Sequence, residues 1–321
     1  MRIARELDGG LAMSGQLAHA PAAAVADARL DRLEAEAIYI LREVSHYARP
    51  ALMFSGGKDS AVLLHLALRA FAPVKPNFVL LHVDTGHNFP EVLAFRDQRA
   101  SESGLNLVVR SVEDSIRRGS VRLASEAASR NGAQAVTLLE AQREFAFDAL
   151  IGGARRDEEK ARAKERVFSH RDAFGAWRPR AQRPELWGLY NRHVAASENM
   201  RIFPLSNWTE ADVWAYIARE RIALPSLYYA HERDVIRRDG LLVPVTELTS
   251  PRESERIERL KVRFRTVGDI TCTCPVESRA ADAEAVLAET LRAAVSERGA
   301  TRLDDRASSA AMERRKLEGY F

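Results

Sequence analysis

The chain has 321 residues, of which 46% are hydrophobic and 29% are charged, as is normal for a globular protein of one large domain or two ordinary ones. Its 48 basic and 45 acidic residues leave a formal charge of +3, too balanced for a protein that coats nucleic acid. Two cysteines are too few for a disulfide framework or a four-cysteine metal site. No apolar run approaches the roughly 20 residues that span a bilayer, and none follows the charged first residues. We therefore expect a cytoplasmic protein without a membrane partner.

The predicted elements begin after a mobile tail. Residues 1–26 are rich in Ala and Gly and have no clear apolar period, so we expect a tail there, with a helix at 21–26 as the alternative for its last residues. An amphipathic helix is expected from residue 28 to about Val44. Short apolar runs then predict buried strands at 51–54, 78–83, 105–109 and 149–151. Helical patterns predict helices at 60–71, 90–103 and 133–147, the second of them closed by Gly104 as its C-cap.

The strands and helices therefore alternate, which predicts the α/β class: a parallel sheet covered by helices on both faces. Such sheets bind ligands beyond the carboxyl ends of their strands. Three of those ends carry Gly-rich or Asp-Thr-Gly turns. We therefore expect the ligand site at that edge.

The second half of the chain has a different character. Residues 155–183 hold ten Lys or Arg and five Asp or Glu. A further strand is expected at 201–205, and a helix at 209–220 with Thr209 as N-cap and Asp212 three residues on. The last helix is expected at 280–298. We divide the chain into a tail (1–26), a nucleotide-binding domain (27–220) and a smaller, less regular C-terminal region (221–321) that docks a partner.

The first chemical motif is a six-residue loop between a predicted strand and a predicted helix. It reads Ser55-Gly56-Gly57-Lys58-Asp59-Ser60. Adjacent glycines let backbone N–H groups approach a polyanion, and the helix that follows presents the positive end of its dipole. The serine hydroxyls can donate hydrogen bonds, and the lysine adds a charge. The loop therefore predicts a phosphate site, with a plain glycine turn and a surface lysine as the alternative.

This loop is not a Walker A motif, because Asp59 follows Lys58 and no Gly lies five residues before Gly57. It resembles the PP-loop, the Ser-Gly-Gly-x-Asp-Ser signature of the ATP pyrophosphatases. That resemblance implies an adenine nucleotide alpha hydrolase-like fold. It also implies that ATP is cut between its α- and β-phosphates, with the pyrophosphate held in the loop.

A second motif leaves the predicted strand at 149–151. It begins with Gly152 and Gly153, and alternating cations and carboxylates follow as far as Arg166. One interpretation is a solvated, salt-bridged helix. We favour an anion site, because the double glycine lies at the ligand edge of the sheet and a guanidinium fork matches a tetrahedral oxyanion.

Taken together, these segments resemble the small-subunit family of bacterial sulfate adenylyltransferases, from about Leu30 to Phe321. The segments that carry the resemblance are 55–60, 82–86, 152–166, 183–187, 203–210, 262–266 and 319–321. The resemblance implies that ATP and sulfate give adenosine 5′-phosphosulfate and pyrophosphate. Positioning and charge stabilisation should then dominate catalysis. Residues 1–26 have no counterpart that we can match, and residues 239–256 look variable against the family pattern, so we assign neither segment a role.

The resemblance also implies site residues. ATP would be bound by Ser55, Gly56, Gly57, Lys58, Asp59, Ser60, His82, Val83, Asp84, Gly152 and Gly153. Sulfate would be bound by Arg155, Arg156, Lys160 and Arg162. Among all of these, Lys58, Arg155 and Arg156 are the expected catalytic residues.

Cofactor and partner follow from the same resemblance. Mg²⁺ should arrive with ATP and bridge its phosphate oxygens, with Asp59 as a weak candidate to support it; we expect no other metal and no redox cofactor. The family's partner is a separate GTPase subunit, in some organisms fused to an adenylylsulfate kinase, and its GTP hydrolysis drives the uphill reaction. No nucleic-acid partner is expected.

Two other enzymes of the PP-loop group are alternatives. A phosphoadenylylsulfate reductase needs a nucleophilic cysteine near its C-terminus, but the last cysteine here is Cys274. A tRNA-modifying enzyme would use the basic segment 155–183, but acidic residues interrupt that segment. We assign no chemistry to Cys272 and Cys274, which we expect to be small buried thiols.

Overall fold

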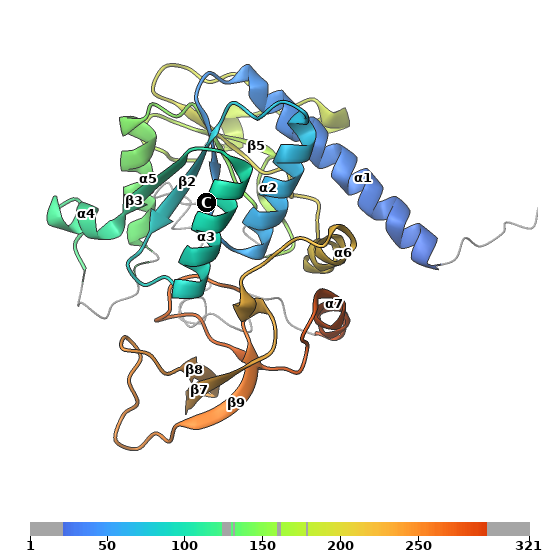
Figure 1. Cartoon of the computed structure of the whole chain (residues 1–321). Helices are drawn as coiled ribbons and strands as arrows, with labels where there is room; N and C mark the ends of the chain where they lie inside the picture. The colour runs from blue at the N-terminus through green and yellow to red at the C-terminus, as the bar shows by residue number, and fades with distance from the viewer. Residues whose placement is uncertain (1–21, 124–129, 131, 159–161, 178, 294–321) are drawn as a thin grey trace, which may run out of the picture.

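The computed structural model describes residues 22–123, 130, 132–158, 162–177 and 179–293. Figure 1 shows a larger sheet with helices around it and a smaller sheet beside it. The strands of the larger sheet are β1 (Pro50–Met53), β2 (Val79–Asp84), β3 (Leu107–Ser111), β4 (Ala149–Ile151), β5 (Phe168–Arg171) and β6 (Asn199–Ile202). The helices are α1 (Ala22–Glu43), α2 (Lys58–Phe71), α3 (Pro90–Ser103), α4 (Val112–Arg117), α5 (Ala133–Glu144), α6 (Glu210–Glu220) and α7 (Ala283–Arg292).

The larger sheet has the strand order β3-β2-β1-β4-β6-β5. All neighbouring pairs are parallel except β5 and β6, which are antiparallel. Leu52 of β1 lies opposite Leu80 of β2 and Ile151 of β4, and all three are buried. The chain builds β2 and β3 on one side of β1 and then crosses to the other side for β4. A crevice for a ligand is therefore expected at the carboxyl end of β1.

Helices pack on both faces of this sheet, as the alternating pattern predicted. On one face, α1, α2, α3 and α6 share a large apolar core with β1 and β2. On the other face, Leu138 and Ala141 of α5 pack against Ala51, Leu81 and Leu150. The predicted parallel α/β sheet is thus confirmed.

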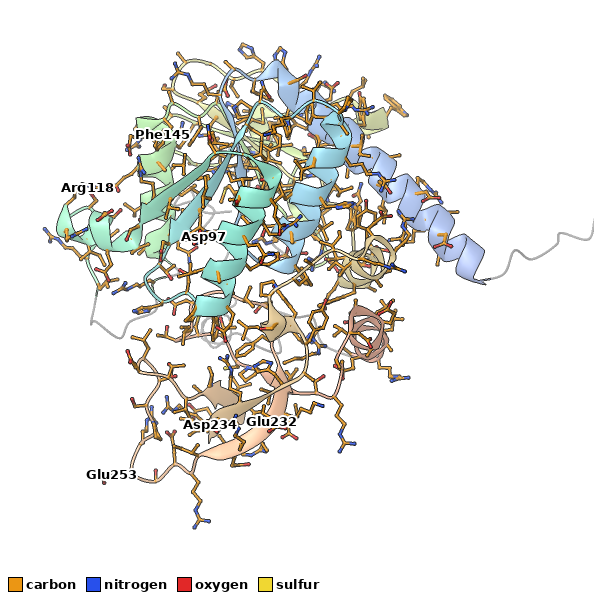
Figure 2. All side chains as sticks on the ribbon, in the orientation of Figure 1. Asp97, Arg118, Phe145, Glu232, Asp234 and Glu253 are labelled. Carbon is orange, nitrogen blue, oxygen red and sulfur yellow. The ribbon has the colours of Figure 1, made fainter. Side chains whose placement is uncertain are left out.

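The C-terminal region forms a second sheet, with the strand order β10-β9-β7-β8 and antiparallel pairs. Its strands are β7 (His231–Arg238), β8 (Leu241–Pro244), β9 (Glu258–Arg263) and β10 (Val276–Glu277). Figure 2 shows Glu232, Asp234 and Glu253 at this end of the molecule. The chain just after β9 joins the main core, where the ring of Phe264 lies 4.9 Å from that of Phe89.

Several elements differ from their predicted limits. The first helix begins at Ala22, inside the segment expected to be a tail, and the rest of that tail lies outside the described residues. The helix expected at 280–298 is described as Ala283–Arg292, and residues beyond 293 lie outside the description. Thr209 and Asp212 form the expected capping box of α6. The sequence did not predict β5, α4 or the second sheet.

Candidate active site

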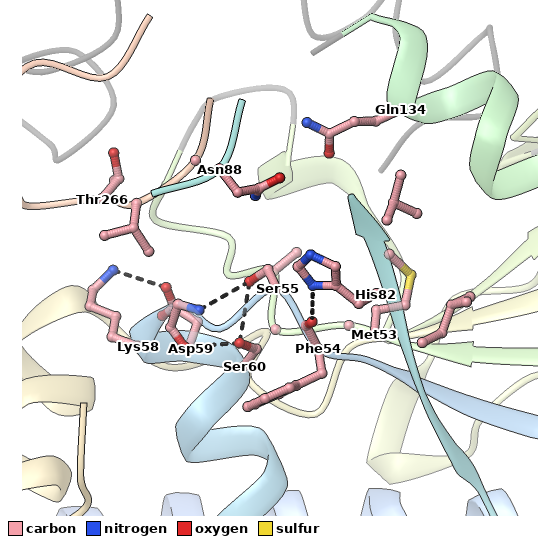
Figure 3. Close-up of a pocket in the computed structure, with 18 of the residues that line it drawn as sticks. Met53, Phe54, Ser55, Lys58, Asp59, Ser60, His82, Asn88, Gln134 and Thr266 are labelled. Carbon is pink, nitrogen blue, oxygen red and sulfur yellow. Dashed lines mark hydrogen bonds and ion pairs between the residues drawn. The ribbon is translucent and has the colours of Figure 1, made fainter. Parts of the chain in front are cut away.

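A cavity opens at the carboxyl ends of β1, β2 and β4 (Figure 3). Its lining comes from the loop after β1, the end of β2, the start of α5 and the chain after β4. Tyr228 and residues 266–268 line it from the C-terminal region. Parallel α/β sheets bind their ligands at this edge, so this cavity is the candidate active site.

The loop 55–60 is held by hydrogen bonds between its own members. Ser55 Oγ accepts from the Gly57 backbone N–H (3.3 Å) and donates to Ser60 Oγ (3.2 Å). Ser60 Oγ in turn donates to the Gly57 carbonyl oxygen (2.9 Å). The helix α2 starts at Lys58, immediately after this turn. The positive dipole end of this helix therefore faces the turn, a position that favours an anion.

Two glycines permit the close packing around this loop. Gly56 has φ +77°, and a Cβ there would lie 2.7 Å from Val92 Cγ1 and 3.1 Å from the Val92 carbonyl oxygen. A Cβ on Gly153 would lie 3.1 Å from Asp59 Cβ. The neighbouring Gly152 donates its N–H to the Ile202 carbonyl oxygen (2.8 Å). The second double glycine thus lets the chain after β4 lie directly against the loop.

A series of ion pairs crosses from this loop to the chain after β4. Lys58 Nζ donates to Asp59 Oδ2 (2.9 Å), and Arg155 Nη1 pairs with the other oxygen of Asp59. The Nε of Arg155 reaches Asp157 (3.1 Å), which accepts the backbone N–H of Glu210 at the start of α6 (2.8 Å). Arg155 is fully buried and is not among the described residues that line the cavity. Its contacts are those of a residue that positions the loop.

Arg162 does line the cavity. It is 5% exposed and lies in the short 3₁₀ helix Arg162–Lys164. Its Nε lies 3.2 Å from Glu158 Oε2, yet neither its Nε nor its Nη1 hydrogen-bonds to a described residue. Glu158 also lines the cavity, and its Oε1 accepts the Arg155 backbone N–H (3.0 Å). The result is a buried guanidinium at the cavity with a donor available.

The other two predicted sulfate contacts lie elsewhere. Arg156 donates from Nη1 to Asn207 Oδ1 and from Nη2 to the Glu165 carbonyl oxygen (3.3 Å). It is not among the described residues that line the cavity. Lys160 lies outside the described residues. Of the three arginines predicted to bind sulfate, Arg162 is therefore the one that lines the cavity among the described residues.

The end of β2 carries three of the predicted ATP contacts. His82 and Val83 line it, whereas Asp84 is not among the described lining residues. Asp84 Oδ1 accepts the Gly86 N–H (2.7 Å), which shapes the turn after the strand. His82 Nδ1 lies 2.8 Å from the Phe54 carbonyl oxygen, and burial lowers the pKa of this imidazole.

Comparison with known proteins gives the family. Residues 49–275 match the phosphoadenosine phosphosulfate reductase domain. Sulfate adenylyltransferase subunit 2 of Mycobacterium sp. (strain JLS) is 59% identical over 290 residues, which are 90% of this chain and 93% of the relative. The protein of the same name from Streptomyces lavendulae is 58% identical over 293 residues, which are 91% and 92% of the two chains. The chain belongs to the sulfate adenylyltransferase subunit 2 family.

One similar solved structure is more distant in sequence. The phosphoadenylyl-sulfate reductase of Candida auris is 19% identical, covers 62% of this chain and 88% of its own, and has a TM-score of 0.40. The family assignment rests on the curated relatives instead, and it makes the chain a nucleotidyltransferase. Within the described ranges, no helix is long and apolar enough to cross a membrane.

This adenylyltransferase family member also has site residues that sequence reasoning missed. Tyr228 Oη accepts the Lys58 backbone N–H (2.9 Å), although 170 residues separate the two. Residues 266–268 line the cavity just before Asp269, whose carboxylate accepts the Arg130 backbone N–H (2.9 Å). The Ile270 N–H donates to the His87 carbonyl oxygen (2.8 Å). Thr266 ends the segment 262–266 that carries the resemblance, but no motif or spacing gave any of these residues a place at the site, because their role depends on how the C-terminal region folds back.

Proposed function

We propose that this chain binds ATP in the cavity and transfers its adenylyl group to sulfate. A sulfate oxygen attacks the α-phosphorus, and a new phosphorus–oxygen bond forms. The bond from the α-phosphorus to the bridging oxygen breaks, and pyrophosphate leaves with that electron pair. The names and identity of the curated relatives support this reaction. It needs little covalent chemistry from the protein, so positioning and charge stabilisation carry the catalysis.

The loop 55–60 is proposed to hold the β- and γ-phosphates. Ser55 and Ser60 offer hydroxyls, and the N-terminus of α2 offers N–H groups. Lys58 is buried beside Asp59, and its charge strengthens the contact as the leaving group separates. The remaining surface proposed to bind ATP is lined by Gly152, Gly153, His82 and Val83.

Arg162 carries the sulfate half of the proposal. A buried donor without a partner lowers stability by about 1–3 kcal/mol, more when it is charged, so its presence at a cavity calls for a ligand. Sulfate is a strongly hydrated dianion and needs directed donors to replace its water. The Nη1 of Arg162 is such a donor, while its Nε faces Glu158 Oε2 (3.2 Å), an ion pair that holds the guanidinium in place. Arg155 and Arg156 are proposed to position this segment through Asp59, Asp157 and Asn207.

Metal and partner complete the proposal. We propose that Mg²⁺ enters with ATP, held mainly by phosphate oxygens; among the described residues there is no group of three or more His, Cys, Asp or Glu that could hold a metal. The relatives are named subunit 2, which supports a partner subunit. We propose that this partner is a GTPase, with or without a fused adenylylsulfate kinase, and that it docks on the C-terminal region. Co-purification from the native host followed by mass spectrometry identifies it.

The test is sulfate-dependent release of pyrophosphate from ATP. It is measured at constant ionic strength with the co-purified partner and GTP present. Arg162→Lys keeps the charge but loses the planar fork, so the KM for sulfate should rise about 10- to 100-fold while the KM for ATP changes little.

Arg263→Lys is the matched control. Arg263 is also a buried arginine, its Nε donates to a carboxylate of Glu289 (2.8 Å), and it is not among the described residues of the cavity. Its KM for sulfate should stay at the parent value. If Arg162→Lys and Arg263→Lys change the KM for sulfate and the KM for ATP to the same extent, Arg162 has a structural role only. If the parent releases no pyrophosphate in response to sulfate, the proposed reaction is wrong.

A further inference from the structure

His82 is a buried histidine of β2 with one ring nitrogen facing the cavity. The residue is 1% exposed, and its Nδ1 lies 2.8 Å from the Phe54 carbonyl oxygen. Its Nε2 is also buried, and it hydrogen-bonds to no described residue. In Figure 3 this nitrogen faces away from Phe54, into the space toward Asn88 and Gln134. A buried polar atom of this kind needs a partner, and the cavity is where a partner would come from.

The hydrogen bond to Phe54 decides which chemistry Nε2 offers. A carbonyl oxygen only accepts, so Nδ1 must carry the proton. A second proton on Nε2 would make a buried imidazolium. Burial lowers the pKa of His82, and the neighbouring Arg96 also disfavours the charge, against the opposing effects of the Phe54 carbonyl and Asp84. The ring is therefore neutral, and Nε2 is an acceptor.

An acceptor at this place has few partners within the proposed substrates. Phosphate and sulfate oxygens are acceptors themselves, so they do not pair with Nε2. They fit the part of the cavity where Lys58 supplies positive charge. Figure 3 shows Lys58 on one side of Ser55 and His82 on the other. ATP has donors in its nucleoside half alone: the 6-amino group of adenine and the two ribose hydroxyls.

We propose that Nε2 of His82 accepts a hydrogen bond from the nucleoside half of ATP and so helps the site to select its nucleotide. The donor is the adenine amino group or a ribose hydroxyl. This inference rests on the proposed function, because it takes ATP as the substrate. It gives a side chain of β2 a specificity role that the strand end would not have through its backbone alone.

The test is direct binding of nucleotides to the full-length chain by isothermal titration calorimetry, which does not depend on turnover. The ligands are ATP, inosine triphosphate, which lacks the 6-amino group, and the 2′-deoxy and 3′-deoxy forms of ATP. The variants are His82→Leu and His82→Phe, which remove the acceptor, and His82→Gln, whose side-chain oxygen restores one.

His231→Leu is the matched control. Its Nδ1 likewise lies 2.9 Å from a backbone carbonyl oxygen, that of Tyr229, and its Nε2 hydrogen-bonds to no described residue. His231 is not among the described residues that line the cavity. The parent and His231→Leu should both bind one of the three analogues about 3- to 10-fold more weakly than ATP, as for the loss of one hydrogen bond.

The expected result in the variants follows from the missing acceptor. His82→Leu and His82→Phe should bind ATP about 3- to 10-fold more weakly than the parent does. They should bind ATP and the analogue that the parent disfavours with equal affinity. His82→Gln should recover part of the ATP affinity and part of the discrimination between the two nucleotides. The analogue that the parent binds more weakly than ATP identifies the donor: inosine triphosphate points to the amino group, and a deoxy form of ATP points to the missing ribose hydroxyl.

The inference is overturned if the parent binds all four nucleotides equally, or if the variants keep the parent's ratios. If the parent binds none of them, the proposed function fails and this inference fails with it. Should His82→Leu fail to fold, His82→Phe and the parent's ratios decide.

Discussion

Gly56 shows how the loop that faces the cavity depends on the absence of a side chain. Gly56→Ala adds one carbon at φ +77°, 2.7 Å from Val92 Cγ1 and 3.1 Å from the Val92 carbonyl oxygen. The left-handed backbone alone costs an L-residue roughly 1–2 kcal/mol. Overpacking against a buried neighbour costs about 1–3 kcal/mol more. We therefore expect Gly56→Ala to lower the free energy of unfolding by about 2–5 kcal/mol.

Gly119 separates these two costs. It has φ +76°, and nothing lies within 4 Å of the position a Cβ would take. Gly119→Ala should therefore cost only the backbone share, about 1–2 kcal/mol. Both variants are measured by equilibrium unfolding in urea, followed by tryptophan fluorescence. The reasoning is refuted if the two variants lose the same stability.

A double variant tests the contact itself. Val92 is 2% exposed, so Val92→Ala alone should lower stability by opening a cavity. In the Gly56→Ala background the same change also removes the carbon that clashes. In that background, Val92→Ala should lower the free energy of unfolding by less than it does in the parent, or should raise it. The difference between the two backgrounds is a coupling energy of about 0.5–3 kcal/mol. Strict additivity would mean that the loop moves away from Val92 at little cost.

Two further predictions concern the cysteines and the pH dependence of stability. Cys272→Ser should be tolerated, because its Sγ already donates to the Asp269 carbonyl oxygen (3.5 Å). The double variant Cys272→Ser, Cys274→Ser buries hydroxyls in place of thiols and should lose ~1–3 kcal/mol in urea unfolding. Sulfate-dependent pyrophosphate release should persist in this double variant, and its loss from a folded protein would reopen the reductase alternative. Burial alone would raise the pKa of Asp212, but hydrogen bonds from Arg29 and from Thr209, together with the Arg29 charge, hold it below its usual value. The stability that Asp212 contributes is thus present above its unfolded pKa of about 3.9 and lost as the pH falls through its folded pKa. Asp212→Asn should therefore be less stable than the parent at pH 7 and differ less from it near pH 3, and an unchanged difference would contradict this.

The parts of the fold that the sequence predicted are those fixed by local pattern. The strand at residues 51–54 and the glycine turn after it are contiguous, so period and turn chemistry were enough to predict them. The same is true of α3, whose observed limits are the predicted ones and whose C-cap Gly104 has φ +63°. The three-residue spacing of Thr209 and Asp212 likewise predicted the capping box that they form.

The missed strands depend on distant partners. In β5, His170 and Arg171 interrupt the apolar pattern, and the strand is held by β6 and by Glu185, which accepts the N–H groups of Val167 and Phe168. In β9, charged residues alternate with apolar ones, as suits a sheet with one face exposed. Short, charged runs of this kind carry little signal until their neighbours are known.

The candidate site divides in the same way. The loop 55–60 was evident from its glycines and its place between strand and helix. The chain after β4 has no regular period, so the sequence could not tell which arginine faces the cavity. Arg155 turns to Asp59 and Asp157, while Arg162 reaches the cavity from a 3₁₀ turn. That choice is made by carboxylates whose positions follow from tertiary packing.

The bond from the Lys58 N–H to Tyr228 also has a consequence for the protein during its synthesis. The loop 55–60 leaves the ribosome early, but Tyr228 follows 170 residues after Lys58, and residues 266–268 follow later still. A nascent chain that already contains the whole larger sheet would still lack one wall of the cavity. The proposed ATP site is therefore incomplete until residues 266–268 have been synthesised, so ATP would stabilise the folded chain rather than the growing one.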